Sequence, residues 1–142
     1  MMASFKIVIA LSAFFLSVGV GQQTKTVATA KRTVKVISIG YHSDTCKECN
    51  VLKAKMKKMN RKFLTAPIVF IKYNKTNKKT QAKSEKKLKK WGMLAIAKKE
   101  EGLKHVVLYN AGTKEAIVTL YPANTVAELE KKIKEALACV GD

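Results

Sequence analysis

Two cysteines separated by two residues, Cys46 and Cys49, stand where one residue pattern gives way to another. The preceding run, Thr33–Tyr41, is rich in β-branched residues and partly alternates, which is typical of a strand. In the run that follows, apolar residues recur at spacings of three and four and so form one stripe of a helix. The sequence therefore predicts a strand that leads directly into a helix over Cys46–Leu64.

A capping pattern predicts where this helix begins. Thr45 is followed three residues later by Glu48, which is the capping-box arrangement, so Thr45 is the expected N-cap and Cys46 the first helical residue. A thiol at that position faces unpaired backbone N–H groups and the positive end of the helix dipole, and both favour the thiolate. Cys46 is therefore the expected nucleophile. Cys49 lies almost one turn later on the apolar stripe and is the expected resolving thiol, because it should be less exposed and able to close a disulfide with Cys46.

The first part of the chain has the pattern of an export signal. Lys6 precedes an uncharged apolar run of fourteen residues, Ile7–Val20, and small and polar residues follow it. This pattern predicts a signal peptide over residues 1–21, because a spanning helix needs about 20 apolar residues; an uncleaved anchor is the alternative. Residues 22–32 are interpreted as a flexible leader before a domain over residues 33–142. Export would place the protein in the periplasm or outside the cell, where disulfides persist.

Three further strands are predicted after the first helix. They are Ile68–Tyr73, His105–Tyr109 and Ala116–Tyr121. The nearly continuous apolar run of the first favours a central parallel strand. The other two flank Asn110–Thr113 and form an expected hairpin.

Two further helices are predicted. One covers about Thr80–Lys98, with Gly92 expected to end or bend it. The other begins at Thr125, which forms a capping box with Glu128. The residues of this last helix expected to face inward are Val126, Leu129, Ile133 and Ala136, and Cys139 is interpreted as a small packing residue beside them.

This order of elements, βαβαββα with CxxC at the first helix start, resembles the thioredoxin fold in its minimal form over roughly Thr33 to Ala138. Tyr41–Cys49 stands where that family carries its active-site loop and dithiol. Gly102–Tyr109 matches the family's loop and third strand, and Asn110–Gly112 its hairpin turn. The resemblance implies an α/β fold, in which a four-stranded mixed sheet is flanked by helices.

The chain departs from the family at three places. The family usually carries Trp before the first cysteine and Gly-Pro between the two, where this chain has Thr45 and Lys47-Glu48. The family's buried acid, the usual proton acceptor for the second thiol, falls on Gly40. The cis-proline that faces the dithiol aligns with Lys104, so the substrate-facing loop is expected to consist of Lys104 and His105. These departures leave the two thiols themselves in place.

The resemblance implies thiol–disulfide exchange without a cofactor. The Cys46 thiolate would attack a protein disulfide and Cys49 would resolve the mixed disulfide, with an upstream redox partner completing the cycle. One alternative is a copper or zinc site, in which His42 or His105 supplies a third ligand beside the thiolates. Another is a redox-inactive binding module that carries an inert disulfide.

The chain is strongly basic. It has 28 Lys and Arg against 10 Asp and Glu, a formal net charge of +18, and 19 basic against 4 acidic residues lie between Lys47 and Lys104. Such a surface attracts anionic lipid, cell-wall polymer or nucleic acid. Because no interleaved aromatic residues form a stacking platform, specific nucleic-acid binding is not expected. The sequence predicts at most weak contact with anionic surfaces, and a monomer.

Overall fold

A computed structural model describes residues 32–141. The predicted signal peptide over residues 1–21 and residues 22–31 of the predicted leader lie outside the described residues. The elements in chain order are β1 (Val36–His42), α1 (Lys47–Lys62), β2 (Ile68–Asn74), α2 (Lys78–Lys90), α3 (Leu94–Lys99), β3 (His105–Asn110), β4 (Ala116–Leu120) and α4 (Val126–Cys139). None of these helices is long and apolar enough to span a membrane.

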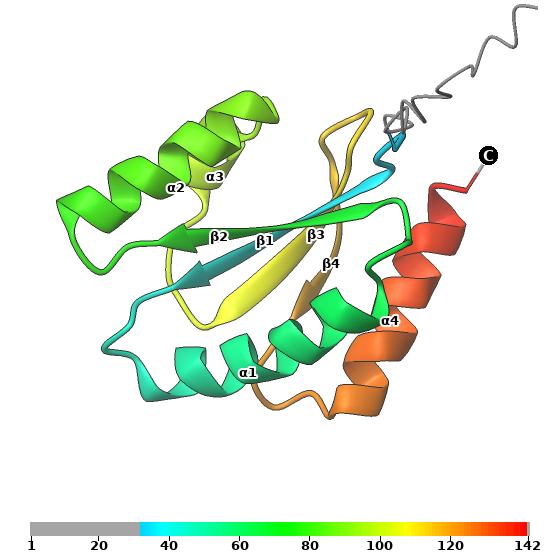
Figure 1. Cartoon of the computed structure of the whole chain (residues 1–142), viewed down its shortest axis with the longest axis horizontal. Helices are drawn as coiled ribbons and strands as arrows, with labels where there is room; N and C mark the ends of the chain where they lie inside the picture. The colour runs from blue at the N-terminus through cyan, green and yellow to red at the C-terminus, as the bar shows by residue number, and fades with distance from the viewer. Residues whose placement is uncertain (1–31, 142) are drawn as a thin grey trace, which may run out of the picture. The chain divides into compact units, whose positions relative to one another are not determined.

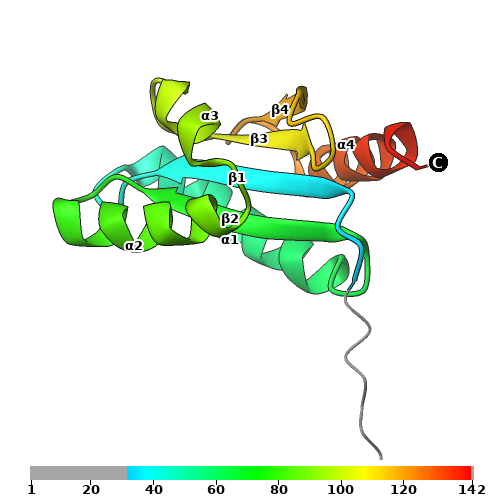
Figure 2. The ribbon, with the colours of Figure 1, turned by 90° about the horizontal axis from the view of Figure 1, so that it is seen from above.

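The strands form one mixed sheet in the order β2-β1-β3-β4. Strands β1 and β2 run parallel, whereas β3 is antiparallel to both β1 and β4. Helices α1 and α4 cover one face, and α2 and α3 cover the other (Figure 1). The view from above follows the strands from β2 at one edge through β1 and β3 to β4 (Figure 2). The predicted four-stranded mixed sheet flanked by helices is therefore confirmed.

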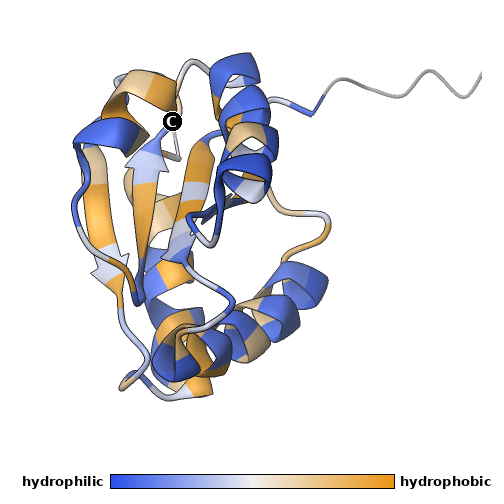
Figure 3. Ribbon diagram, turned by 90° about the vertical axis from the view of Figure 1, so that its left-hand side faces the viewer, coloured by the Kyte–Doolittle hydropathy of each residue, from blue (hydrophilic) through white to orange (hydrophobic). Residues whose placement is uncertain are grey.

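The side chains of β1 alternate between two cores. Val36 packs on one face with Leu52 of α1 and Ile133 of α4. Ile39 packs on the opposite face with Leu88 of α2. Figure 3 accordingly shows apolar residues on the strands and on the sides of the helices that face the sheet, and polar residues on the outer sides. Side chains alternate between the two faces of a strand and recur every 3.6 residues on one side of a helix. Apolar residues can therefore pack on both faces of the sheet, which gives three layers.

The predicted central position of the strand beginning at Ile68 is wrong. Strand β2 does pair in parallel with β1, but it lies at an edge of the described sheet. Its apolar run arises because Phe70 packs toward α1 and α4 while Ile71 and Tyr73 pack toward α2 and α3. A strand that has helices packed on both of its faces has a nearly continuous apolar run, whether it lies in the centre of the sheet or at its edge.

The helix predicted over Thr80–Lys98 is two helices. Helix α2 begins after Asn77, which forms a capping box with Thr80, and α3 begins only at Leu94. Gly92 lies between them with φ +67°, a left-handed conformation that glycine adopts at little cost. The expected break at this glycine is therefore confirmed.

The last helix begins as predicted, with Thr125 as N-cap and a capping box to Glu128. Of the residues expected to face inward, Leu129, Ile133 and Ala136 are buried, but Val126 and Cys139 are exposed. At about 100° per residue, these two positions lie some 60–80° from Leu129 on the helical wheel. They therefore flank the buried stripe, and the inward prediction for Val126 and the packing prediction for Cys139 are wrong.

Candidate functional site

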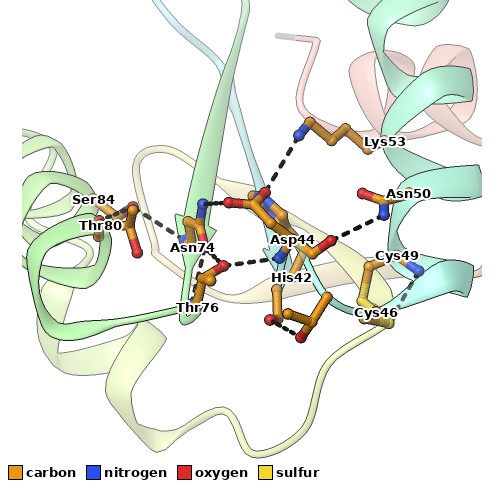
Figure 4. Close-up of polar contacts among 12 residues, drawn as sticks. His42, Asp44, Cys46, Cys49, Asn50, Lys53, Asn74, Thr76, Thr80 and Ser84 are labelled. Atoms are coloured by element: carbon orange, nitrogen blue, oxygen red, sulfur yellow. Dashed lines mark hydrogen bonds and ion pairs between the residues drawn. A yellow bond between two sulfur atoms is a disulfide. The ribbon is translucent and has the colours of Figure 1, made fainter.

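Cys46 and Cys49 form a disulfide at the N-terminal end of α1, with their Cα atoms 5.2 Å apart (Figure 4). Cys46 is half-buried, whereas Cys49 is only 2% exposed and faces the core. The two sulfur atoms therefore differ in access: a partner can approach Cys46 from solvent and cannot approach Cys49 in the same way.

The N-cap of α1 is Cys46 and not Thr45, so the predicted capping box is wrong. Cys46 has extended backbone angles, and its Sγ accepts a hydrogen bond from the Cys49 backbone N–H at 3.2 Å. The Thr45 hydroxyl instead pairs with the Ser43 hydroxyl at 3.0 Å. The Cys46 N–H donates a hydrogen bond to the Ser43 carbonyl and closes a turn before the helix, so the helix begins one residue later than predicted. In the reduced protein, a sulfur in this position receives a backbone hydrogen bond that favours the thiolate.

Glu48, the expected capping partner, instead faces the loop before β3. Its Oε2 lies 2.8 Å from Lys104 Nζ, and both side chains are largely exposed. Lys104 has φ +71° and its backbone N–H donates to the Tyr41 carbonyl at 3.1 Å. No peptide bond within residues 32–141 is cis. The structure thus brings Lys104 to the CxxC segment, as the resemblance implied, but through a left-handed lysine and an ion pair.

His105, the second residue expected to face substrates, is 9% exposed. Its Nδ1 lies 3.1 Å from the Leu103 carbonyl, its Nε2 lies 3.0 Å from Glu100 Oε1, and its ring stacks on Tyr41 at 4.9 Å. Both ring nitrogens are therefore engaged. The part of the chain that the structure describes contains no group of three or more His, Cys, Asp or Glu placed to hold a metal, so its geometry adds nothing to the copper or zinc alternative.

A hydrogen-bond network around Asp44 holds the loop that leads to the disulfide (Figure 4). The Asp44 N–H donates to Thr76 Oγ1 at 2.8 Å, and Asn74 Nδ2 donates to the Asp44 carboxylate at 3.0 Å. From α1, Asn50 donates to the Asp44 carbonyl at 3.2 Å and Lys53 Nζ lies 3.5 Å from its carboxylate. The Asn74 hydrogen bond, followed by Lys53 and Thr76, lowers the pKa of Asp44 below its ordinary value.

The CxxC pattern does not indicate this network, although the sequence contains a signal for it. Asp44 follows β1, and Asn74 ends β2. The carboxyl ends of two adjacent parallel strands meet at one edge of the sheet, where polar residues commonly gather. Parallel pairing of the two strands was predicted, so the proximity of Asp44 and Asn74 could have been inferred from it.

A cavity of about 110 Å³ lies between α1 and the sheet, and Cys49 is one of the residues that line it. Its polar and charged lining residues include Ser38, His42, Lys53, Lys57 and Lys72. Gly40, where the family's buried acid would fall, also lines it. A Cβ added at Gly40 would meet Val106 Cγ2 at 3.5 Å, an ordinary contact, so space alone does not require glycine there.

His42 is 7% exposed, and its imidazole Nε2 lies 3.7 Å from Asp44 Oδ1. Burial, and to a lesser extent the charges of Lys53 and Lys72, lower the pKa of His42 below its ordinary value. The Gly40 backbone and the Asp44 carboxylate act in the opposite direction. His42 is therefore a buried imidazole that is neutral at neutral pH and lines the same cavity as Cys49.

No family model and no curated protein matches this chain. Its structure is similar to that of a thiol:disulfide interchange protein, a thioredoxin family protein from Chlorobium tepidum TLS, with 13% identity, a TM-score of 0.54, and coverage of 74% of this chain and 81% of that one. It is also similar to Trxlp from Edwardsiella tarda EIB202 (11% identity, TM-score 0.47, coverage 70% and 82%). A third similar structure is thioredoxin f2 from Chlamydomonas reinhardtii (16% identity, TM-score 0.45, coverage 77% and 82%). The first of these likenesses confirms that the fold is thioredoxin-like.

Proposed function

We propose that this chain is an extracytoplasmic thiol–disulfide oxidoreductase that exchanges disulfides with protein substrates through Cys46 and Cys49. The observation that supports it most is the disulfide at the N-cap of α1, in a thioredoxin-like fold, with one sulfur accessible and the other buried beneath it. A thioredoxin-like fold with a CxxC disulfide is the setting of thiol–disulfide exchange in general.

Exchange proceeds in two sulfur transfers. The Cys46 thiolate attacks one sulfur of a substrate disulfide, a mixed disulfide forms, and the other substrate sulfur leaves as a thiolate. The Cys49 thiolate then attacks Cys46 Sγ, the bond to the substrate breaks, and the second substrate sulfur leaves with the electron pair. Two electrons pass from the protein dithiol to the substrate, and the reverse sequence oxidises a substrate dithiol. The greater access of Cys46 supports its assignment to the first step.

Residues beside the disulfide would meet the substrate. Lys104 is half exposed and lies against Glu48, so it is the residue of the loop before β3 that we expect to contact a bound polypeptide. His105 is buried and bonded on both nitrogens, so we expect it to support this loop from within. The ion pair also counters the effect of the Glu48 carboxylate, which would otherwise oppose the nearby thiolate.

The reduction potential of the Cys46–Cys49 pair tests the proposal. The full chain with Cys139→Ser, which removes the third thiol, is equilibrated against glutathione buffers and the thiol state is read by alkylation. We expect a reversible two-electron transition between about −270 and −120 mV, the range of known exchange proteins. A bond that resists every buffer, or a pair that never closes, would overturn the proposal.

Two single-cysteine variants serve as matched controls. In the Cys139→Ser background, Cys49→Ser should form a stable mixed disulfide with a protein substrate, because the resolving thiol is absent. Cys46→Ser should trap little, because the remaining sulfur is buried. Equal trapping by the two variants would contradict the assigned roles. The captured proteins would also identify the substrate and the upstream redox partner.

The proposed location and surface contacts need separate tests. A reporter that is active only outside the cytoplasm, joined after residue 32, should be active in the periplasm or medium, and Leu11→Arg should abolish this activity by interrupting the apolar run. For the basic surface, we expect at most weak, salt-dependent binding to vesicles that contain anionic lipid. A negative result in either test would contradict only the proposed location or the proposed surface contact, and not the exchange chemistry.

A further inference from the structure

His42 lines the same cavity as Cys49, and neither of the two sulfur transfers involves its imidazole. We propose that His42 is the proton acceptor that activates Cys49 for the resolving step, across the cavity that both residues line. This inference rests on the proposed function and deepens it, since it names the group that makes the second sulfur reactive.

Cys49 requires such a group because it is buried. Cys49 is only 2% exposed, and burial of a thiol disfavours its charged thiolate form. The attacking species in the resolving step is the thiolate, so Cys49 must lose its proton within the site. The first sulfur has no such requirement, because Cys46 lies at the N-cap and accepts a backbone hydrogen bond.

Only one titratable group around the cavity is suited to receive this proton. Among the described residues, the titratable and charged groups near His42 are Tyr41 and Asp44 on its own segment, Cys49, Lys53 and Lys57 on α1, Lys72 on β2 and His105 on β3. The Tyr41 hydroxyl is paired with the Tyr109 hydroxyl. A lysine ammonium has no lone pair and can stabilise a thiolate but not accept its proton. His105 is engaged by the Leu103 carbonyl and Glu100. Of the two imidazoles on the cavity wall, that of His105 has both ring nitrogens engaged, whereas His42 Nε2 lies 3.7 Å from Asp44 Oδ1, beyond hydrogen-bond distance, and can accept the proton.

The surroundings of His42 suit both of its charge states. Burial and the charges of Lys53 and Lys72 lower its pKa, so the imidazole keeps a free lone pair at neutral pH. Once it takes a proton, the Asp44 carboxylate 3.7 Å from Nε2 stabilises the imidazolium. Asp44 is held ionised and in place by Asn74, Lys53 and Thr76.

His42 and Cys49 line the same cavity from β1 and α1, and Gly40 adds no side chain to the part of the wall that β1 forms. The cavity has a volume of about 110 Å³ and is lined mainly by apolar residues, but the exposed residues Lys53, Lys57 and Asn60 also line it, so solvent water can enter and bridge a thiol and an imidazole.

The proton and electron balance of the step is complete. The proton of Cys49 Sγ passes through this water to the imidazole, and the thiolate attacks Cys46 Sγ. The Cys46–Cys49 bond forms, the bond to the substrate breaks, and the electron pair leaves on the substrate sulfur. The imidazolium then returns its proton through solvent to the departing thiolate. No oxidant beyond the substrate disulfide is required.

The test separates the two sulfur steps in one experiment. The reduced full chain with Cys139→Ser is mixed rapidly with 5,5′-dithiobis(2-nitrobenzoic acid), whose coloured thiolate is released once by Cys46 and once more when Cys49 resolves the mixed disulfide. We expect His42→Asn to leave the first release within about twofold and to slow the second on the order of 100-fold, the usual contribution of a positioned base.

The pH dependence provides a readout that a merely structural role would not move. In the Cys139→Ser chain that retains His42, the rate of the second release should rise as pH increases through the pKa of His42, which lies below its ordinary 6.5, and should then level off. In His42→Asn, it should rise only near the ordinary thiol value of about 8.5 and above. His42→Gln, which differs in length, should give the same profile and so guards against a local packing effect.

A second polar residue of the cavity wall provides the matched control. Ser38→Ala removes a buried hydroxyl of β1 from the same cavity without removing the proposed acceptor, so the rate and pH profile of the second release should be unchanged. If His42→Asn and His42→Gln leave the second release unaltered, or Ser38→Ala slows it equally, the role of His42 is overturned. If the unmodified chain shows no first release, the proposed function itself fails, and the inference fails with it.

Discussion

The two faces of the sheet differ most at the end that carries the disulfide. On the α2 and α3 face, Ile39 and Tyr41 of β1 lie in a closed core, and the Tyr41 hydroxyl pairs with the Tyr109 hydroxyl at 3.0 Å. On the α1 face, the alternate residues Gly40 and His42 border a cavity that reaches Cys49. One strand thus supplies a packed scaffold to one side and open space to the other.

A small fold can hold a buried reactive sulfur when the two faces of one strand differ in this way. The closed face fixes β1 against β2 and β3, and therefore fixes where the loop after His42 begins. On the open face, Cys49 borders a cavity that is also lined by His42 and three lysines, and not a close-packed wall. Rigidity and proton access come from opposite faces of the same strand.

Leucine truncation on each face should produce the largest effect. Leu88→Ala removes a fully buried side chain from the closed core and should lower the free energy of unfolding by about 4–5 kcal/mol. Leu52→Ala, beside the existing cavity, should cost only about 2–3 kcal/mol, because its side chain already lacks partners on one side. Urea denaturation of the oxidised full chain measures both. Equal losses would show that the two faces are packed alike.

Removal of the Tyr41 hydroxyl probes the closed face further. Tyr41→Phe leaves the buried Tyr109 hydroxyl without its partner and should cost about 1–2 kcal/mol of stability. The double variant with Tyr109→Phe should recover part of this loss, because neither hydroxyl is then left unpaired. The same denaturation experiment provides the measurement. A neutral single substitution would mean that solvent reaches this pair.

Two glycines sharpen the contrast between open space and backbone strain. Gly40→Ala places a methyl group into the cavity at ordinary contact distance and should stabilise the fold by about 0.5 kcal/mol. A methyl group at Gly92 would meet no atom within 4 Å, yet Gly92→Ala should destabilise the fold by about 1 kcal/mol because φ is +67°. Thermal unfolding distinguishes the two signs. A loss at Gly40 comparable with that at Gly92 would show that the cavity does not accept a methyl group.

The smallest effect is the pH dependence contributed by Asp44. Hydrogen bonds lower the pKa of Asp44 below 3.8, so its contribution to stability is present above its unfolded-state pKa and is lost as pH falls through the folded-state value. Asp44→Asn should therefore be less stable than the parent at pH 7 and approach it near pH 2. Chemical denaturation between these limits measures the difference. A constant difference across this range would contradict the assignment.

Local pattern predicted most of the fold, because periods of two and 3.6 depend on neighbours in the chain. The break at Gly92 and the cap at Thr125 followed from single residues with strong local preferences. The edge position of β2 did not follow, since an edge strand covered on both faces has the same apolar run as a central one. Strand order depends on pairing partners that are distant in the sequence.

The candidate site was predicted less completely than the fold. The two cysteines and the approach of Lys104 followed from motif and resemblance. The cap moved from Thr45 to Cys46 because both side chains can accept a hydrogen bond, and a turn outside the helix decides between them. The cavity beside His42 depends on how α1 packs on the sheet, which no local pattern records.

The edge position of β2 also bears on self-association. An apolar edge strand presents unpaired N–H and C=O groups on which a second chain can extend the sheet. Lys72 interrupts the apolar run of β2, and its pKa is lowered by partial burial and by the charges of Lys53, Lys57 and Lys87, which come from the two flanking helices. Two copies that met along this edge would bring these ammonium groups together. Repulsion between these lysines therefore opposes extension of the sheet along β2, most strongly at low ionic strength.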